Sequence, residues 1–79
     1  MWYIYILICA DERTYVGCTN NLDSRLIRHN KGFVLATKDR LPVKLIGYFA
    51  IKDEKKAFAF EKYLKTGVGR VFIKKRIFS

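Results

Sequence analysis

The sequence predicts a small α/β domain in which a three-stranded antiparallel sheet is flanked by helices, in the order ββαβαα. Residues 2–9 are an unbroken run of β-branched and aromatic residues, which is typical of a strand covered on both faces. Two later segments have helical spacing behind good N-cap residues. With 79 residues the chain is long enough for one compact domain, residues 1–79, but not for two.

The first half of the chain is predicted to form a β-hairpin followed by a helix. Residues 10–13 supply a turn after the first strand, and residues 14–18 form a second, shorter strand. A helix then runs over roughly residues 21–31, with N-cap candidates in Thr19-Asn20-Asn21 and an end at Gly32.

Two charged or titratable residues of this helix lie close to its apolar side. Leu22 and Leu26 are four residues apart and should form the buried stripe. Arg25 and His29 are also four apart, and they lie beside that stripe rather than opposite it. Taken singly, each has an ordinary interpretation, as a solvated charge and as a surface or capping histidine.

The second half of the chain is predicted to contain a third strand and two helices. Residues 33–41 carry mixed polarity and are expected to form an exposed loop, and Val43–Ile51 is the third strand. The last segment, Gly69–Phe78, is expected to be a short basic helix that docks inward through Val71, Phe72, Ile77 and Phe78.

The second helix, Glu54–Lys65, carries a carboxylate in an apolar stripe. Asp53 is its N-cap and Thr66-Gly67 should end it, while its inward face is marked by Ala57, Phe58, Phe60 and Leu64. Glu61 falls within this stripe, where a charge is costly unless a cation, a metal ion or strong donors meet it. An ion pair with an arginine such as Arg25 and a metal site both satisfy this requirement.

The charge of the chain favours a polyanionic partner. Sixteen Lys and Arg stand against seven Asp and Glu, which gives a formal net charge of +9. Such a surface suits nucleic acid, because neutralised phosphates release condensed counterions. A basic protein without such a partner has the same composition. A membrane surface is not expected as a partner, because no helix pairs a long apolar face with a basic one.

The two cysteines argue against a zinc site. Only Cys9 and Cys18 occur, with no CxxC motif and no cluster with histidine, although pairing of the first two strands as a hairpin could bring them near each other. We expect both to be free thiols in a reducing compartment such as the cytoplasm. The apolar residues 1–8 are too few to span a bilayer and are interpreted as a strand.

The chain resembles the GIY-YIG nuclease family. Its first motif is Tyr3-Ile4-Tyr5, and Tyr15-Val16-Gly17 follows ten residues after Tyr5. Arg25 lies ten residues past the second tyrosine and His29 four residues later, as in that family's first helix. Residues 61–65 and 67–70 are similar to the metal-carboxylate helix and tail of the small stand-alone bacterial members, and the whole is similar to the N-terminal nuclease domain of the excision-repair incision subunit.

This resemblance implies a catalytic site and a cofactor. The site residues would be Tyr5, Tyr15, Arg25, His29 and Glu61. Glu61 would be the sole protein ligand of one Mg²⁺ or Mn²⁺ ion, and Arg25 would contact the scissile phosphate. Tyr5, Tyr15 and His29 all remain candidates for the group that takes a proton from the attacking water.

The implied function is metal-dependent hydrolysis of phosphodiester bonds in DNA, weakly selective or selective for branched or flapped structures, in repair or recombination. Backbone contacts are expected from Gly17 and from basic residues of the loop and tail, namely Lys38, Arg40, Arg70, Lys74, Lys75 and Arg76. A nucleic-acid-binding module without turnover is the alternative, and a small protein that docks on an acidic partner is a third. Cutting both strands needs a second subunit or a second event, so a homodimer or a larger repair complex is a candidate assembly.

Three positions depart from the family pattern. Tyr3 stands where the family name has glycine, although the tyrosine of the motif is intact. Cys18 follows the second motif, where some relatives have lysine. No asparagine occurs after Asn30, so the late asparagine of several larger members is missing.

Overall fold

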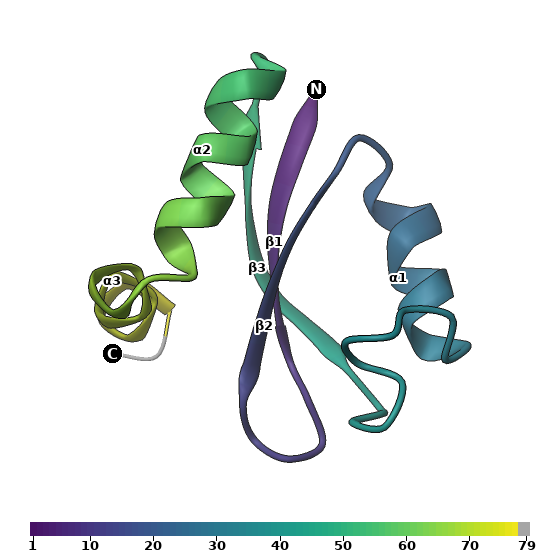
Figure 1. The fold of residues 1–79 in the computed structure, drawn as a ribbon. Coiled ribbons are helices and arrows are strands. Elements are labelled where there is room, and N and C mark those ends of the chain that lie inside the picture. Colours follow the sequence, from purple (N-terminus) through teal and green to yellow (C-terminus); the bar gives the residue numbers. More distant parts are fainter. Residues whose placement is uncertain (78–79) are drawn as a thin grey trace.

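The computed structural model of the protein describes residues 1–77, so the predicted docking of Phe78 lies outside the described residues. Two strands, a helix, a third strand and two further helices follow one another along the chain (Figure 1). Their bounds are β1 Trp2–Ile8, β2 Thr14–Thr19, α1 Leu22–Asn30, β3 Lys44–Ile51, α2 Glu54–Leu64 and α3 Gly67–Ile77. The predicted order ββαβαα is confirmed.

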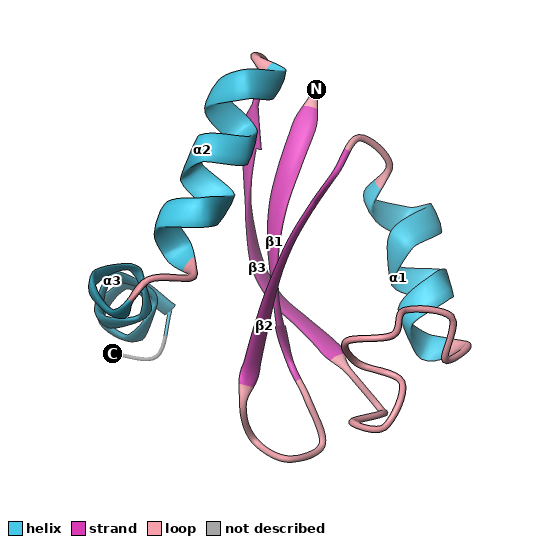
Figure 2. Cartoon of the chain, viewed as in Figure 1, coloured by secondary structure: helices cyan, strands magenta, loops and turns pink. Residues whose placement is uncertain are grey.

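The sheet has the strand order β2-β1-β3, and β1 pairs antiparallel with both neighbours (Figure 2). In this register Tyr5 lies opposite Gly17 on β2 and opposite Tyr48 on β3. The second tyrosine of the sequence motif, Tyr15, is two residues from Gly17 on β2. The hairpin therefore places both motif tyrosines on the same face of the sheet, since side chains alternate along a strand.

Helices cover both faces of the sheet, with α2 and α3 on one side and α1 on the other (Figure 1). Ile4 and Ile6 of β1 belong to an apolar cluster with α2 and α3, whereas Tyr5 and Leu7 belong to a second cluster beside α1. All four side chains are at most 1% exposed. The prediction that the first strand is covered on both faces is therefore confirmed.

The ends of the helices follow from local residues. The Asn21 side chain accepts a hydrogen bond from the Ser24 amide at 3.0 Å and caps α1, and Asp53 caps α2 through the Lys56 amide at 2.9 Å. Gly32 has φ +78, a backbone conformation that favours glycine and ends the turn after α1. The predicted caps at Asn21, Asp53 and Gly32 are thus in place.

The last two helices differ from the sequence prediction in two ways. Thr66 accepts a hydrogen bond from the Gly69 amide at 3.1 Å and so caps α3, which begins two residues earlier than predicted. Phe58 and Val71 were expected to face inward, but they are 45% and 52% exposed. Ile73 is buried instead, because α3 crosses the end of α2 and presents a narrower stripe to the core.

The segment between α1 and β3 is only partly the exposed loop that its composition predicts. Leu35 is 79% exposed, but Thr37 is completely buried. Arg40 pairs with Asp11 at the tip of the β1–β2 hairpin, with Nε 2.7 Å from the carboxylate, and its carbonyl accepts from the Ala10 amide at 2.9 Å. The segment is therefore tied to the hairpin, and Thr37 lies three residues before this contact.

Two further features concern the cysteines and the helices. Cys9 and Cys18 are both free thiols. Within residues 1–77 no helix combines the length and the apolar character needed to cross a membrane.

Candidate active site

Tyr5 occupies space that only glycine leaves open on the neighbouring strand. A Cβ atom added at Gly17 would lie 2.3 Å from both Cζ and the hydroxyl oxygen of Tyr5. The phenol ring therefore lies directly against the backbone of β2. Gly17 is buried beneath this ring, so its first role is to admit Tyr5.

Tyr5 and His29 form a buried pair that continues to a third residue. The Tyr5 hydroxyl lies 2.9 Å from Nε2 of His29, and Nδ1 of the same ring lies 2.7 Å from Oγ1 of Thr37. His29 and Thr37 are both completely buried. Sequence reasoning identified Tyr5 and His29, but it assigned Thr37 to an exposed loop.

Burial sets the protonation states of this pair. Burial, and then the positive charge of Arg25, hold the pKa of His29 below its ordinary value, so the imidazole is neutral at neutral pH. Burial also raises the pKa of the Tyr5 hydroxyl, with a smaller contribution from the nearby Tyr15, so Tyr5 keeps its proton. The charges of Arg25 and Glu61 act on the same hydroxyl in opposite directions.

Tyr15 lies at the more open side of this pair. Its ring centroid is 5.3 Å from that of His29 and 6.4 Å from that of Tyr5. Tyr15 is half-buried, whereas Tyr5 and His29 are 1% and 0% exposed. Of these three residues, only Tyr15 can meet solvent or substrate without movement of its neighbours.

Glu61 approaches the tyrosines from α2. Its side chain is 19% exposed, and its Oε2 lies 3.2 Å from the ammonium of Lys65, which also lies 5.7 Å over the Tyr15 ring. Among the described residues Glu61 therefore has its ion pair with Lys65 rather than with Arg25, the partner that sequence reasoning considered. Lys65 joins the carboxylate to the tyrosine and was not predicted as a site residue.

The arrangement suits an ion with one protein ligand better than a protein cage. No group of three or more His, Cys, Asp or Glu side chains is placed to hold a metal ion in residues 1–77. Glu61 offers one partly exposed carboxylate next to the phenols. Mg²⁺ retains most of its water and is often bound by one or two carboxylates together with substrate phosphate. The donor set at Glu61 therefore fits such an ion.

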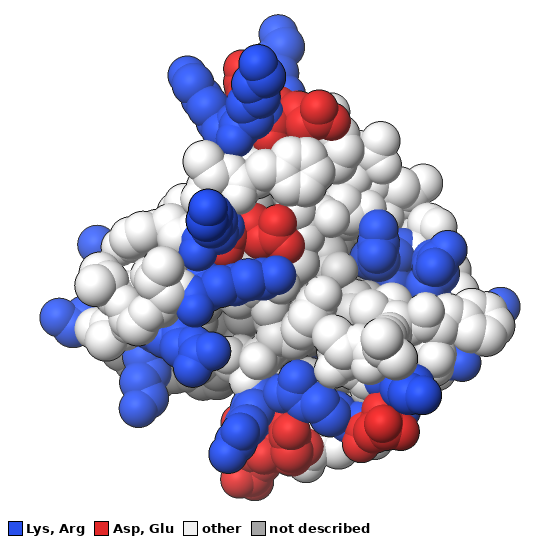
Figure 3. Space-filling view, in the orientation of Figure 1, with Lys and Arg blue, Asp and Glu red and all other residues white. Residues whose placement is uncertain are grey.

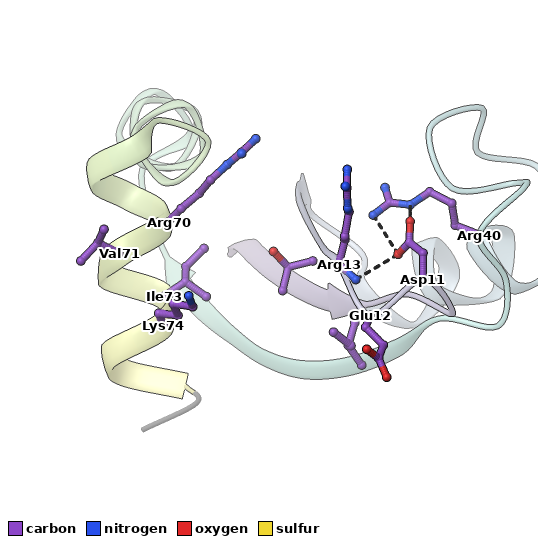
Figure 4. Close-up of a pocket in the computed structure, with 10 residues that line it drawn as sticks. Asp11, Glu12, Arg13, Arg40, Arg70, Val71, Ile73 and Lys74 are labelled. Carbon is purple, nitrogen blue, oxygen red and sulfur yellow. Dashed lines mark hydrogen bonds and ion pairs between the residues drawn. The ribbon is translucent and has the colours of Figure 1, made fainter.

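Basic side chains lie on both sides of this region. Figure 3, drawn from the side of β2, shows lysine and arginine over α1 and over α2 and α3, with acidic atoms among them on the α2 side. A second basic feature is a hollow between the hairpin tip and α3, lined by Arg13, Arg40, Arg70 and Lys74 as well as Asp11 and Glu12 (Figure 4).

The charges of this hollow are unequal. Asp11 is engaged by Arg40 and by the Arg13 amide, which keeps the pKa of its carboxyl below the ordinary value. In Figure 4 the Arg13 and Arg70 side chains extend in the same direction from opposite sides, whereas Glu12 points away from them. Thr14 also lines the hollow, and it precedes Tyr15 on β2, although the two side chains point to opposite faces of the sheet.

The basic residues expected to contact DNA come mainly from two parts of the chain, the segment before β3 and helix α3. Lys38 is exposed on the segment before β3, and Lys74, Lys75 and Arg76 are exposed on α3. The Arg76 guanidinium lies 5.6 Å over the Phe72 ring. The Arg40 guanidinium is paired with Asp11.

Comparison with known proteins gives concordant matches. Residues 1–75 match the family model of the GIY-YIG catalytic domain. A UPF0213 protein of Clostridium perfringens is 42% identical over 66 residues, which are 82% of this chain and 71% of that relative. A UPF0213 protein of Lactococcus lactis subsp. cremoris is 39% identical over 64 residues, 80% of this chain and 65% of the relative. The chain thus spans about two thirds of the length of these relatives.

A solved structure has the same architecture. The solution NMR structure of a UPF0213 protein from Bacillus halodurans matches with a TM-score of 0.59 and 28% sequence identity. The match covers 98% of this chain and 87% of the other.

Proposed function

The chain belongs to the GIY-YIG family, as the resemblance of its motifs implied, and we propose that it is a divalent-metal-dependent DNA endonuclease. The observation that carries this proposal is the convergence of Tyr5, Tyr15, His29, Arg25 and Glu61 around the buried phenol of Tyr5. These residues come from β1, β2, α1 and α2, so the fold and not the local sequence assembles them.

Each residue has a role that its surroundings support. Glu61 would hold one Mg²⁺ or Mn²⁺ ion, which supplies Lewis-acid stabilisation of charge on the phosphate. The Arg25 guanidinium would bind nonbridging oxygens of the scissile phosphate. Tyr15, the partly exposed member of the three base candidates, would hold or deprotonate the attacking water. Tyr5 and His29 would support it from behind.

The hollow between the hairpin and α3 would hold the sugar-phosphate backbone of the strand being cut. Arg13, Arg70 and Lys74 line it, and Thr14, the residue before Tyr15, lines it as well. Lys38, Lys75 and Arg76 would extend this contact. Phosphate contacts orient a nucleic acid without reading its sequence, which supports weak or structure-selective cutting. We place this activity in repair or recombination of branched or flapped DNA in the cytoplasm, where Cys9 and Cys18 would stay reduced.

The test is cleavage of supercoiled plasmid and of branched and flapped DNA with Mg²⁺ or Mn²⁺. Glu61→Gln should reduce the rate by at least roughly 10²-fold, the scale seen when one stabiliser of transition-state charge is removed. Glu54→Gln is the matched control, because it removes an exposed carboxylate from the first turn of the same helix. Thermal unfolding monitored by circular dichroism would verify that both variants fold.

The two outcomes have different meanings. Cleavage by the wild type and Glu54→Gln but not by Glu61→Gln would support the endonuclease and the metal site. Salt-sensitive DNA binding without cleavage by any of the three proteins would reject the hydrolase and favour a binding module of the same fold.

A further inference from the structure

Thr37 lies outside the sequence motifs, yet it is joined to the centre of the site. It is completely buried in a segment that otherwise faces solvent, and its hydroxyl lies 2.7 Å from Nδ1 of His29. The opposite ring nitrogen, Nε2, lies 2.9 Å from the Tyr5 hydroxyl. Three side chains from α1, β1 and the segment before β3 thus form one chain of hydrogen bonds.

The donors and acceptors of the hydrogen bonds among Thr37, His29 and Tyr5 can be counted. A neutral imidazole has one N–H donor and one acceptor nitrogen, whereas each hydroxyl can donate one hydrogen. If Tyr5 donated to Nε2, the N–H at Nδ1 would donate to Thr37. The hydroxyl hydrogen of Thr37 would then have no acceptor among the hydrogen bonds of residues 1–77, although the side chain is completely buried.

The opposite direction of these hydrogen bonds gives the Thr37 hydroxyl hydrogen an acceptor. Thr37 donates to Nδ1, and the N–H at Nε2 donates to the Tyr5 oxygen. The hydrogen left over is then that of the Tyr5 hydroxyl, which lies against Gly17 on the side where Arg25 and Glu61 exert their charges. A buried hydroxyl hydrogen without an acceptor is unfavourable, and only the Tyr5 end of this hydrogen-bond network adjoins the partly exposed Tyr15 and Glu61, where water can accept the hydrogen.

We propose that Thr37 is a positioning residue that holds His29 in the tautomer with hydrogen on Nε2, so that the hydroxyl hydrogen of Tyr5 is directed toward the site that Tyr5 shares with Tyr15, Arg25 and Glu61. The tautomer rests on the count of donors and acceptors in the protein without substrate, and only its kinetic consequence rests on the proposed endonuclease activity. The clamp between Arg40 and Asp11 holds the segment that carries Thr37. It thereby contributes to the site without touching it.

The direct test is the ¹⁵N NMR spectrum of the His29 side chain at a pH where the ring is neutral. His29 is the single histidine of the chain, so the spectrum contains one imidazole. We expect Nδ1 to have the shift of an unprotonated nitrogen and Nε2 that of an N–H. A wild-type spectrum with the hydrogen on Nδ1 would overturn the inference. Because this measurement needs no variant, a failure of Thr37→Val to fold would not prevent the test.

Two variants test the role of the hydroxyl. Thr37→Val keeps the shape of the side chain and removes its donor, so the two tautomers should become mixed. Thr37→Ser restores the hydroxyl and should restore the wild-type spectrum. In cleavage assays Thr37→Val should lower kcat by roughly tenfold with KM little changed, the scale expected for a residue that orients a catalytic side chain. Thr37→Ser should stay within about twofold of the wild type.

The outcomes separate the two proposals. Unchanged tautomer and unchanged kcat in folded Thr37→Val would overturn the role of Thr37 while leaving the endonuclease intact. A wild type that cleaves no substrate would overturn the proposed function, and the NMR spectra would still decide whether Thr37 holds the ring.

Discussion

The two faces of β1 are built on different principles. Towards α2 and α3 the strand presents Ile4 and Ile6 to a cluster of apolar side chains, where volume is what matters. Towards α1 it presents Tyr5, whose hydroxyl must meet one nitrogen of His29 while the other nitrogen meets Thr37. The first face tolerates rearrangement of its side chains, whereas the second depends on particular atoms in particular places.

The surroundings of one glycine on each neighbouring strand show the same difference between the two faces. A Cβ atom at Gly17 would meet the ring and hydroxyl of Tyr5 at 2.3 Å on the side of α1. A Cβ atom at Gly47 would approach the terminal methyl of Ile77 at 2.9 Å on the side of α3. That methyl can move by rotation of its side chain, while the tyrosine ring is held by a strand and by a hydrogen bond.

The largest expected effect is on stability, and it is measured by comparing substitutions at two adjacent residues of β1 that point to opposite faces. Ile6→Ala should lower the free energy of unfolding by about 2–5 kcal/mol, because it leaves a cavity in the apolar cluster. Tyr5→Phe should lower it by only about 1–2 kcal/mol, through the lost hydrogen bond to His29. The cleavage rate per folded molecule should respond in the opposite order. Urea denaturation and cleavage assays on both variants measure this, and equal losses of activity would contradict the comparison.

The next effect concerns the two glycines. Gly17→Ala should displace Tyr5, destabilise the protein by about 1–3 kcal/mol through overpacking, and largely abolish cleavage. Gly47→Ala, its matched control, should change the unfolding free energy by less than about 1 kcal/mol. The conformational entropy saved by replacing a glycine in a strand should offset the unfavourable contact with the Ile77 methyl. Near-wild-type cleavage by Gly17→Ala would show that Tyr5 does not need its present position.

A smaller effect is the dependence of stability on pH. The folded state holds the pKa of His29 below 6.5, so below that pH the unfolded chain binds the proton more readily. The unfolding free energy should therefore fall on acidification below pH 6.5, with a slope of at most about 1.4 kcal/mol per pH unit from this residue. The contribution of Asp11 is lost only below its ordinary value of 3.8. His29→Gln should remove the upper phase alone, and an unaltered profile would argue against a buried neutral imidazole.

The smallest expected effect concerns Lys65 at the end of α2, which lies next to Tyr15 at the edge of the sheet. Its ammonium is 3.2 Å from the Glu61 carboxylate and competes with a divalent cation there. A helical i,i+4 pair is worth about 0.3–0.5 kcal/mol, so Lys65→Gln should lower the metal concentration for half-maximal cleavage about twofold. Lys62→Gln, which removes an exposed lysine of the same helix, should leave that concentration unchanged. The same metal concentration for half-maximal cleavage in both variants would show that Lys65 does not influence metal binding.

Local chemistry made most of the fold predictable. The caps at Asn21 and Asp53, the glycine at 32 and the apolar run of β1 each act within a few residues, so the order of elements can be inferred from the sequence. Thr66 was interpreted as the end of α2 only, because a helix that starts immediately after another has no separate signal. Phe58 and Val71 have the right spacing to face inward, but the place where α3 crosses α2 is a tertiary property.

The site could be predicted only where its residues belong to sequence motifs. The spacing of those residues can be recognised in the sequence, whereas their mutual contacts depend on the fold. They are Tyr5, Tyr15, Arg25, His29 and Glu61. Thr37 has no signal of its own, since a threonine between exposed loop residues is ordinary in composition. Its burial against His29 is a tertiary contact, and the segment that carries it is tied to the hairpin by Arg40 and Asp11, residues 29 positions apart that no periodicity connects.

The packing of Tyr5 over Gly17 also has a consequence for how related sequences can diverge. The ring and the missing side chain share one volume, so neither position is free to change by itself. A lineage that replaces the glycine must first reduce the ring, and one that reduces the ring removes the reason for the glycine. We expect the two positions to covary among relatives, and a chain that has lost both is expected to have given up the chemistry while keeping the sheet.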